Sequence, residues 1–166
     1  MRAVQVIFAA AVLLLATGIK LAAALETVPL YHTLLFVPAS FARLLTGENY
    51  AELAGTYRFS VFILDYSCAG VNFLMLCIFA GAWHSMQRVQ NVAQLLRALL
   101  LITFGAFAAT NLANTFRIGL SLKLFPLVER HDWMHEAIGT IVFFSFLIGY
   151  YQLFLRSLNA KTHSAG

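Results

Sequence analysis

Four long apolar stretches constrain the fold of this chain more than any other feature of its sequence. They cover about residues 3–25, 59–83, 92–113 and 136–155 and hold very few charges. Each is close to the roughly 20 residues that a helix needs to cross the hydrocarbon core of a bilayer. Because backbone N–H and C=O groups find no water in lipid, such segments fold as helices, which satisfy these groups internally. The sequence therefore predicts an all-α, polytopic membrane helical bundle with about four transmembrane helices.

The composition agrees with a membrane protein. Hydrophobic residues make up 61% of the 166-residue chain and charged residues only 11%, whereas soluble domains carry about 25% charged residues. The net charge is +4, but the basic residues stand singly beside apolar runs, which is typical of membrane topology and not of nucleic-acid binding. No linker or internal repeat divides the chain. We therefore expect one domain, residues 1–166, embedded in the lipid bilayer.

The segment between the first two apolar stretches is more than a loop. Residues 28–41 are apolar but short, and Pro29 and Pro38 interrupt them. A run of this length suits an interfacial or re-entrant piece, and residues 46–49 have the composition of a turn. Two interpretations stand side by side: an inert cover over the bundle, or one wall of an outward-facing substrate groove.

The acidic residues all lie on one predicted side of the membrane, in or beside segments 26–58 and 114–135. They are Glu26, Glu48, Glu52, Asp65, Glu129, Asp132 and Glu136. The charged residues on the other side are all basic, namely Arg2, Arg88, Arg97, Arg156 and Lys161. Positive charge in short flanks favours the cytoplasmic side. We therefore expect both termini and the 84–91 loop to be cytoplasmic, although basic residues on the outer side weaken the bias.

The N-terminal stretch also has the pattern of a secretory signal. Arg2 precedes the apolar run, and residues 22–24 supply small side chains for a cleavage site. Lys20, so close to that site, argues against cleavage. Removal of a signal would leave three helices and would not change the side on which the rest of the chain lies.

Cys68 is the first residue that points to chemistry. It lies about nine residues inside the outer end of the predicted second helix, on the order of 13 Å below the start of that run. Small residues at 67, 69 and 70 allow another helix to approach closely, and Asn72 is expected one turn further on the same face. A lone cysteine is also compatible with inert packing, which we expect of Cys77. The two thiols are too far apart on one helix for a disulfide.

Arg117 is the second such residue. It follows Asn111 and Asn114 at three-residue spacing, so the three side chains share one helix face. A charged residue within a membrane segment is costly and points to function. The alternative is a side chain that extends to the lipid headgroups from a helix end.

His135 is the third, at the start of the fourth apolar stretch. His131 lies four residues before it, with Asp132 and Glu136 nearby, so a metal site is conceivable. The pair lacks a clear third ligand, and we expect no metal. We interpret His131 as a solvated residue, although the sequence does not decide whether His135 or His131 would serve as a base. Asp65 could orient a base, pair with Arg117 or extend to the headgroups, and we assign it no catalytic role. Paired histidines also hold haem, but His32, His84 and His163 do not lie mid-helix at matched depth, and we expect no cofactor.

A cysteine, a guanidinium and an imidazole near one membrane face are the components of a nucleophilic acyl-transfer site. Their motifs are also specific in combination. Residues 67–74 (SCAGVNFL) resemble the nucleophile motif of the exosortase/archaeosortase family, and residues 114–118 (NTFRI) resemble its N-x-x-R-I motif. His135, followed by Gly139 and Phe143, resembles its third motif. The short chain looks most like the exosortase K subgroup, whereas many family members have eight or so membrane helices.

This resemblance implies a cysteine transpeptidase or protease of the bacterial cytoplasmic membrane. It would act on exported proteins that end in a sorting signal of the PEP-CTERM type: a short motif, a membrane-spanning helix and a basic tail. Cys68 would be the nucleophile that forms a thioester, Arg117 would stabilise the thiolate and the oxyanion, and His135 would act as general acid and base. Asn72 and Asn114 would support them. The acceptor would be an amine or water.

Two further functional classes remain open from the residues alone. One is a small non-catalytic membrane subunit, since helices rich in glycine and alanine pack against partners. The other is a haem- or quinone-linked redox protein.

Overall fold

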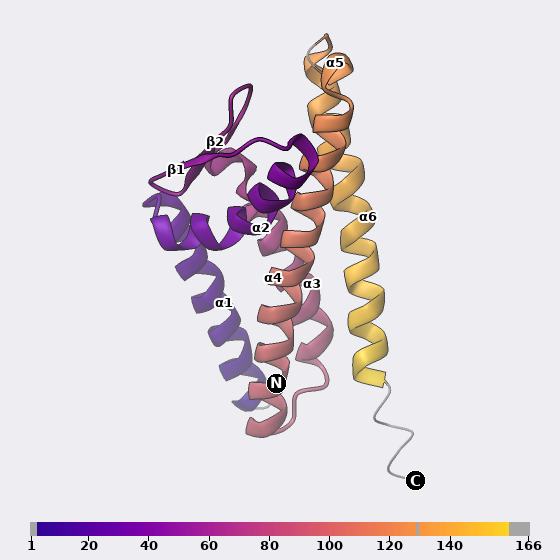
Figure 1. The fold of residues 1–166 in the computed structure, drawn as a ribbon. Helices are drawn as coiled ribbons and strands as arrows, with labels where there is room; N and C mark the ends of the chain where they lie inside the picture. The colour runs from indigo at the N-terminus through magenta and orange to yellow at the C-terminus, as the bar shows by residue number, and fades with distance from the viewer. Residues whose placement is uncertain (1–2, 129, 160–166) are drawn as a thin grey trace.

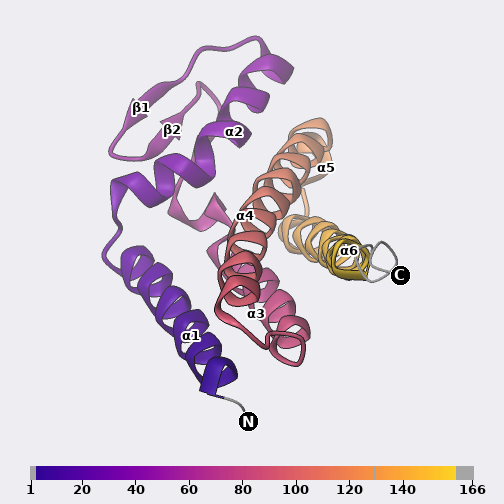
Figure 2. The same ribbon diagram turned by 90° about the horizontal axis from the view of Figure 1, so that it is seen from below.

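The computed structural model describes residues 3–128 and 130–159, which form a bundle of long helices (Figure 1). The helices are α1 (Ala3–Ala24), α2 (Val28–Thr46), α3 (Val71–Met86), α4 (Val92–Lys123), the short α5 (Phe125–Val128) and α6 (Asp132–Asn159). In Figure 1 α1, α3, α4 and α6 run roughly along the bundle, with α3 and α4 between the other two, as Figure 2 also shows. The predicted class, an all-α polytopic helical bundle, is confirmed.

Helix α2 corrects the predicted helix count. It is one continuous helix of 19 residues and not a short interrupted piece. Pro29 lies in its first turn, where a missing N–H breaks no intrahelical bond, and Pro38 is accommodated inside the helix, where it is buried. Gly47 ends the helix in a left-handed conformation with φ of 71°. Among the described residues, five helical segments are thus long and apolar enough to cross a membrane, although α2 lies across the bundle above α1 and below the upper ends of α4 and α6 in Figure 1.

The second apolar stretch begins its helix much later than predicted. Residues 51–64 instead form a three-stranded antiparallel sheet, in the order β1 (Ala51–Leu53), β2 (Thr56–Arg58) and β3 (Ile63–Leu64). The prediction of a helix from residue 59 was wrong because aromatic and β-branched residues, which suit strands, are as apolar as helix formers. A short 3₁₀ helix, η1 (Tyr66–Ala69), then leads into α3.

Helices α4 and α6 extend further than their apolar stretches. Helix α4 continues ten residues beyond the predicted end at 113 and has 32 residues, about 48 Å at 1.5 Å per residue. That length exceeds the roughly 30 Å of the hydrocarbon core. Part of the expected 114–135 loop is therefore helical, and α4 and α6 project beyond α2 at the upper end of the bundle (Figure 1).

The connections alternate between the two ends of the bundle. In Figure 1 the start of α1, the α3–α4 turn and the end of α6 lie at the lower end. Helix α2, the sheet and α5 lie at the upper end. Three of the charged residues used to predict the membrane orientation, Arg2, Glu129 and Lys161, lie outside the described residues. His163 also lies outside them.

The centre of the bundle depends on close helix approach. A Cβ atom on Gly81 of α3 would lie 2.8 Å from Tyr150 Oη and 3.1 Å from Ile102 Cγ1. A Cβ on Gly105 of α4 would lie 3.2 Å from Tyr150 Cε2. Small residues thus let α3, α4 and α6 meet around one tyrosine.

Candidate functional site

Cys68 lies in the η1 turn that precedes α3, not nine residues inside a helix as predicted. The carboxylate of Asp65 accepts hydrogen bonds from the Ser67 N–H (2.9 Å) and from Ser67 Oγ (2.6 Å), and the Cys68 N–H donates to the Asp65 carbonyl (3.0 Å). Gly70, with φ of 69°, then turns the chain into α3. Asp65 therefore shapes the turn that carries the thiol, which is partly buried. The other thiol, Cys77, is buried within α3.

Asn114 joins this turn to α4. Its side chain is fully buried, and Nδ2 donates to the backbone carbonyl of Cys68. A Cβ on Gly70 would lie 3.4 Å from Thr110 Cγ2 and 3.8 Å from Asn114 Cγ, so the turn packs directly on α4. Asn111, by contrast, donates to the Phe107 carbonyl of its own helix.

Arg117 is buried one turn beyond Asn114 and is only 9% exposed, so it does not extend to the lipid headgroups. Its guanidinium carbon lies 5.3 Å from the centre of the Phe143 ring on α6. A Cβ on Gly139 would lie 3.6 Å from Arg117 Cδ. Among the described residues, its Nε has no hydrogen-bond partner and no carboxylate pairs with its guanidinium.

A pocket of about 520 Å³ lies beside this turn. Its lining includes Ser67 and Gly70, on either side of Cys68 in the chain, and also Arg117 and Phe143. The Cys68 side chain itself is not among the lining groups. The structure thus places the thiol-bearing turn and the guanidinium at one pocket.

Tyr31 and Tyr66 form another wall of the pocket. Their ring centres are 4.3 Å apart, and their hydroxyls donate to the carbonyls of Ala23 and Ala54, each at 2.9 Å. Helix α2, through Tyr31, and η1, through Tyr66, therefore both contribute to the lining of the pocket.

A polar cluster fastens the sheet to α2. His32 Nδ1 lies 2.8 Å from Glu52 Oε1 and 2.9 Å from the Tyr57 hydroxyl. Burial, with a smaller contribution from Glu52 and Tyr50, raises the pKa of Tyr57 to about 12. The phenol therefore stays protonated at neutral pH and remains available as a hydrogen-bond donor.

His135 is not brought into contact with Cys68 or Arg117. It is exposed on the first turn of α6, and no hydrogen bond joins it to either residue within the described chain. It precedes Gly139 by four residues, so the two share a helix face about 5–6 Å apart, and Gly139 faces Arg117. His131 is also exposed. No group of three described His, Cys, Asp or Glu side chains could hold a metal ion.

Asn72 is not on a common helix face with Cys68, because the two lie on opposite sides of the left-handed Gly70. Its Oδ1 instead accepts a hydrogen bond from Lys20 Nζ on α1 (2.6 Å). Sequence reasoning used Lys20 only as an argument against cleavage of an N-terminal signal. A lone lysine near the end of such a stretch is nevertheless the kind of signal that points to a polar site.

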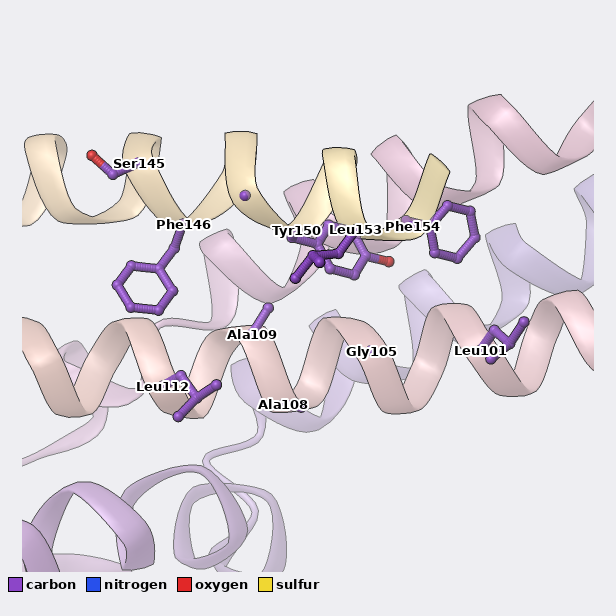
Figure 3. A pocket seen from close by; sticks show the side chains of 11 residues that line it. Leu101, Gly105, Ala108, Ala109, Leu112, Ser145, Phe146, Tyr150, Leu153 and Phe154 are labelled. Atoms are coloured by element: carbon purple, nitrogen blue, oxygen red, sulfur yellow. The ribbon is translucent and has the colours of Figure 1, made fainter. Parts of the chain in front are cut away.

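A second hollow lies between α4 and α6 (Figure 3). It has a volume of about 590 Å³ and is lined almost entirely by apolar groups, including Leu101, Ala108 and Leu112 of α4 and Phe146 and Leu153 of α6.

The chain matches no protein-family model, no curated protein and no solved structure with which it was compared.

Proposed function

We propose that this chain is a membrane cysteine transpeptidase or protease that resembles the exosortases. It cleaves a C-terminal sorting signal of exported proteins through a thioester. The observation that carries the proposal is the hydrogen bond from Asn114 to the Cys68 carbonyl, since it joins two motifs that are 46 residues apart in the chain. Phe143 of the third motif lies against both: a Cβ on Gly70 would be 3.8 Å from its ring, and Arg117 lies over that ring.

The first step is attack by the Cys68 thiolate on the carbonyl carbon of the scissile peptide bond. A carbon–sulfur bond forms, and the carbonyl oxygen becomes an oxyanion. Arg117 stabilises this charge, because a largely buried and fixed cation interacts strongly with it. The N-terminus of α3, which begins directly after the Cys68 turn, adds positive potential on the same side.

The oxyanion then collapses, and the carbon–nitrogen bond breaks. His135 lies outside the pocket lining, one turn from the contact between Gly139 and Arg117, and the proposal requires it to reach the leaving amine. There it donates a proton to the amine, which departs with the C-terminal part of the signal. An amine or a water molecule next attacks the thioester carbon and gives its proton to His135, and Cys68 leaves as the thiolate. An amine acceptor completes a transfer, whereas water completes a proteolysis.

The membrane arrangement supports the same reading. The η1 turn that carries Cys68 follows the sheet directly and packs against α2, so the site lies on the same side of the bundle as α2 and the sheet. The elements there carry the acids Glu26, Glu48, Glu52 and Asp65, whereas Arg88 and Arg97 lie near the turn at the opposite end. With the end that carries no described acid in the cytoplasm, both termini are cytoplasmic and the site opens at the outer face of the bacterial cytoplasmic membrane. A substrate anchored by its own membrane helix presents its motif at that level.

The experiment is co-expression of the chain with an exported protein that ends in such a tripartite signal. Cys68→Ala is expected to reach the membrane at the normal level and to leave the substrate uncleaved. Cys77→Ala is the matched control, since it removes the other thiol, and it should process normally. Cleavage by the Cys68→Ala variant would overturn the proposal.

The alternative of a non-catalytic subunit is favoured by one observation, the apolar hollow between α4 and α6 (Figure 3). Such a subunit should tolerate Cys68→Ser in every assay and should not react selectively at Cys68 with a thiol reagent. A haem-linked redox protein would instead show a Soret band after purification.

A further inference from the structure

The pocket beside the Cys68 turn gathers positive charge without a matching negative charge. Lys20 of α1 and Arg117 of α4 both line it, as do residues 70–73 at the start of α3. No acidic side chain described by the structure lines it. Three positive groups from three helices therefore face one hollow.

The N-terminus of α3 is the first of these groups. Its N-cap is Gly70, which has no side chain and leaves the helix without a side-chain cap. The first backbone N–H groups of a helix have no intrahelical acceptor, and the helix dipole makes this end positive. An uncapped helix N-terminus that opens on a pocket is suited to bind an anion.

Lys20 is held at this same helix end. Its Nζ donates to Asn72 Oδ1 at 2.6 Å, and Asn72 is the second residue of α3. Asn72 is neutral, so the hydrogen bond leaves the lysine charge unbalanced. A cation beside a helix N-terminus is unfavourable on its own, and an anion between them would reverse that repulsion.

Arg117 supplies the buried part of the site. It is more than nine-tenths buried, its Nε lacks a partner among the described residues, and it lines the pocket. Burial of an unpaired charge is costly. An anion that enters the pocket would offset this cost and would meet a planar group that donates two parallel hydrogen bonds.

We propose that this pocket binds the phosphate group of a membrane phospholipid between Lys20, Arg117 and the N-terminus of α3. The site shares Arg117 and the N-terminus of α3 with the proposed catalytic step, so lipid and oxyanion would occupy the same groups in turn, but it holds whether or not Cys68 is a nucleophile. Phosphate oxygens can accept hydrogen bonds from several converging donors, which matches this arrangement. The pocket, at about 520 Å³, has room for the groups that flank the phosphate.

The position in the bundle favours a lipid as the source of the phosphate. Lys20 lies about 26 Å along α1 from Ala3 at 1.5 Å per residue, close to the boundary of a hydrocarbon core of roughly 30 Å. Leu76, one turn further along α3, lines the pocket and is also exposed at the surface of the bundle. It offers an apolar surface at which acyl chains can leave the pocket.

The test is binding to the purified, delipidated full chain, followed by native mass spectrometry and by thermal unfolding. The probes are phosphatidylglycerol, a diacylglycerol with the same acyl chains, and inorganic phosphate alone. We expect phosphatidylglycerol to bind and raise the unfolding temperature, diacylglycerol to have little effect, and inorganic phosphate to bind more weakly. The Cys68→Ala chain should bind the lipid like the wild type, which separates this proposal from the catalytic one.

Two variants and one control make the test specific. Lys20→Gln removes an exposed charge and should weaken phosphatidylglycerol binding about tenfold, the effect of losing a charge-assisted hydrogen bond. Asn72→Asp places a carboxylate beside Lys20 and should weaken binding at least as much. Lys123→Gln is the control, since Lys123 is an exposed lysine on α4 near the upper end of the bundle but outside this pocket.

Three results would overturn the proposal. The first is phosphatidylglycerol binding that Lys20→Gln leaves unchanged or that Lys123→Gln weakens equally. The second is inorganic phosphate binding as tightly as the lipid, which would remove the lipid assignment. The third is Lys20-dependent binding of an acidic substrate peptide with no binding of phosphatidylglycerol.

Discussion

Two of the hollows in the described part of the chain have similar volumes and opposite chemistry. One, of about 520 Å³, lies beside the Cys68 turn and contains Lys20, Arg117 and the start of α3. The other, of about 590 Å³, lies between α4 and α6 and has almost entirely apolar walls (Figure 3).

This difference shows that the volume of a hollow does not by itself identify a functional site in a membrane protein. Lipid chains can fill an apolar hollow at the side of a bundle, because they are as apolar as the leucines that line it. In a hollow with a buried guanidinium, the positive charge is costly unless a polar or anionic group interacts with it, and hydrocarbon chains offer no such group. We therefore expect activity to depend strongly on the polar pocket and weakly on the apolar one.

The largest effect is expected from Cys68→Ser, which keeps a small polar side chain in the turn and removes the thiol. Processing should fall by at least about 1,000-fold, since loss of a nucleophile removes the covalent pathway. The rate of substrate cleavage in membranes measures it. An unchanged rate would mean that the turn is only a packing element.

Arg117→Lys should reduce processing by about 100- to 1,000-fold. Lysine keeps the charge but not the planar fork that fits over Phe143 and toward an oxyanion. Arg97→Lys makes the same change near the other end of α4, where the side chain is exposed, and should have no effect. Equal losses in both variants would argue against a special role for Arg117.

His135→Gln should reduce the rate by about 100-fold, because it removes the general acid and base. His131→Gln shows which histidine transfers the proton, since both histidines are exposed and lie four residues apart. A larger loss in His131→Gln would transfer the proton-transfer role to that residue.

Cys68 and Arg117 could be singled out from the sequence because membrane burial restricts polar side chains, whereas the place of His135 outside the pocket could not. A cysteine among small residues and an arginine after two asparagines stand out in an apolar chain. The long helices could be predicted for a related reason, since continuous apolar runs have few alternatives in lipid. The contact between Asn114 and the Cys68 turn follows from tertiary packing and not from spacing.

Other features could not be read from the pattern. The 51–64 sheet contains apolar strand residues that hydropathy does not distinguish from helical ones. Helix α2 continues through Pro38 because this residue is buried within the packed bundle, which local propensity does not capture. The bond between Lys20 and Asn72 joins residues 52 positions apart, and no local rule predicts it.

Asn114→Ala tests how the thiol-bearing turn is held. It leaves the Cys68 carbonyl without its donor, so the chain should lose about 1–3 kcal/mol of stability, and processing should fall about tenfold as the turn loosens. Asn111→Ala is matched in chemistry and removes a bond only within α4. Thermal unfolding measures the stability of both variants, and cleavage assays measure their rates. A clear loss of cleavage rate is expected in Asn114→Ala and not in Asn111→Ala.

The smallest effect is expected in the apolar hollow. Leu112 lines it and is 60% exposed, so Leu112→Ala should change stability by no more than about 0.5 kcal/mol and leave processing within about twofold. A loss of processing rate as large as that of Arg117→Lys would contradict the expected difference between the two hollows. It would indicate that the apolar hollow binds substrate.

The most direct test of the central claim is capture of the acyl-enzyme. The chain is mixed with substrate in membranes and quenched with acid, and the Cys68 and Cys77 peptides are examined by mass spectrometry. The account predicts a substrate fragment attached to Cys68 through a hydroxylamine-sensitive bond, with Cys77 unmodified. Substrate cleavage that continues when Cys68 is replaced, or an acyl group found only on another residue, would contradict it.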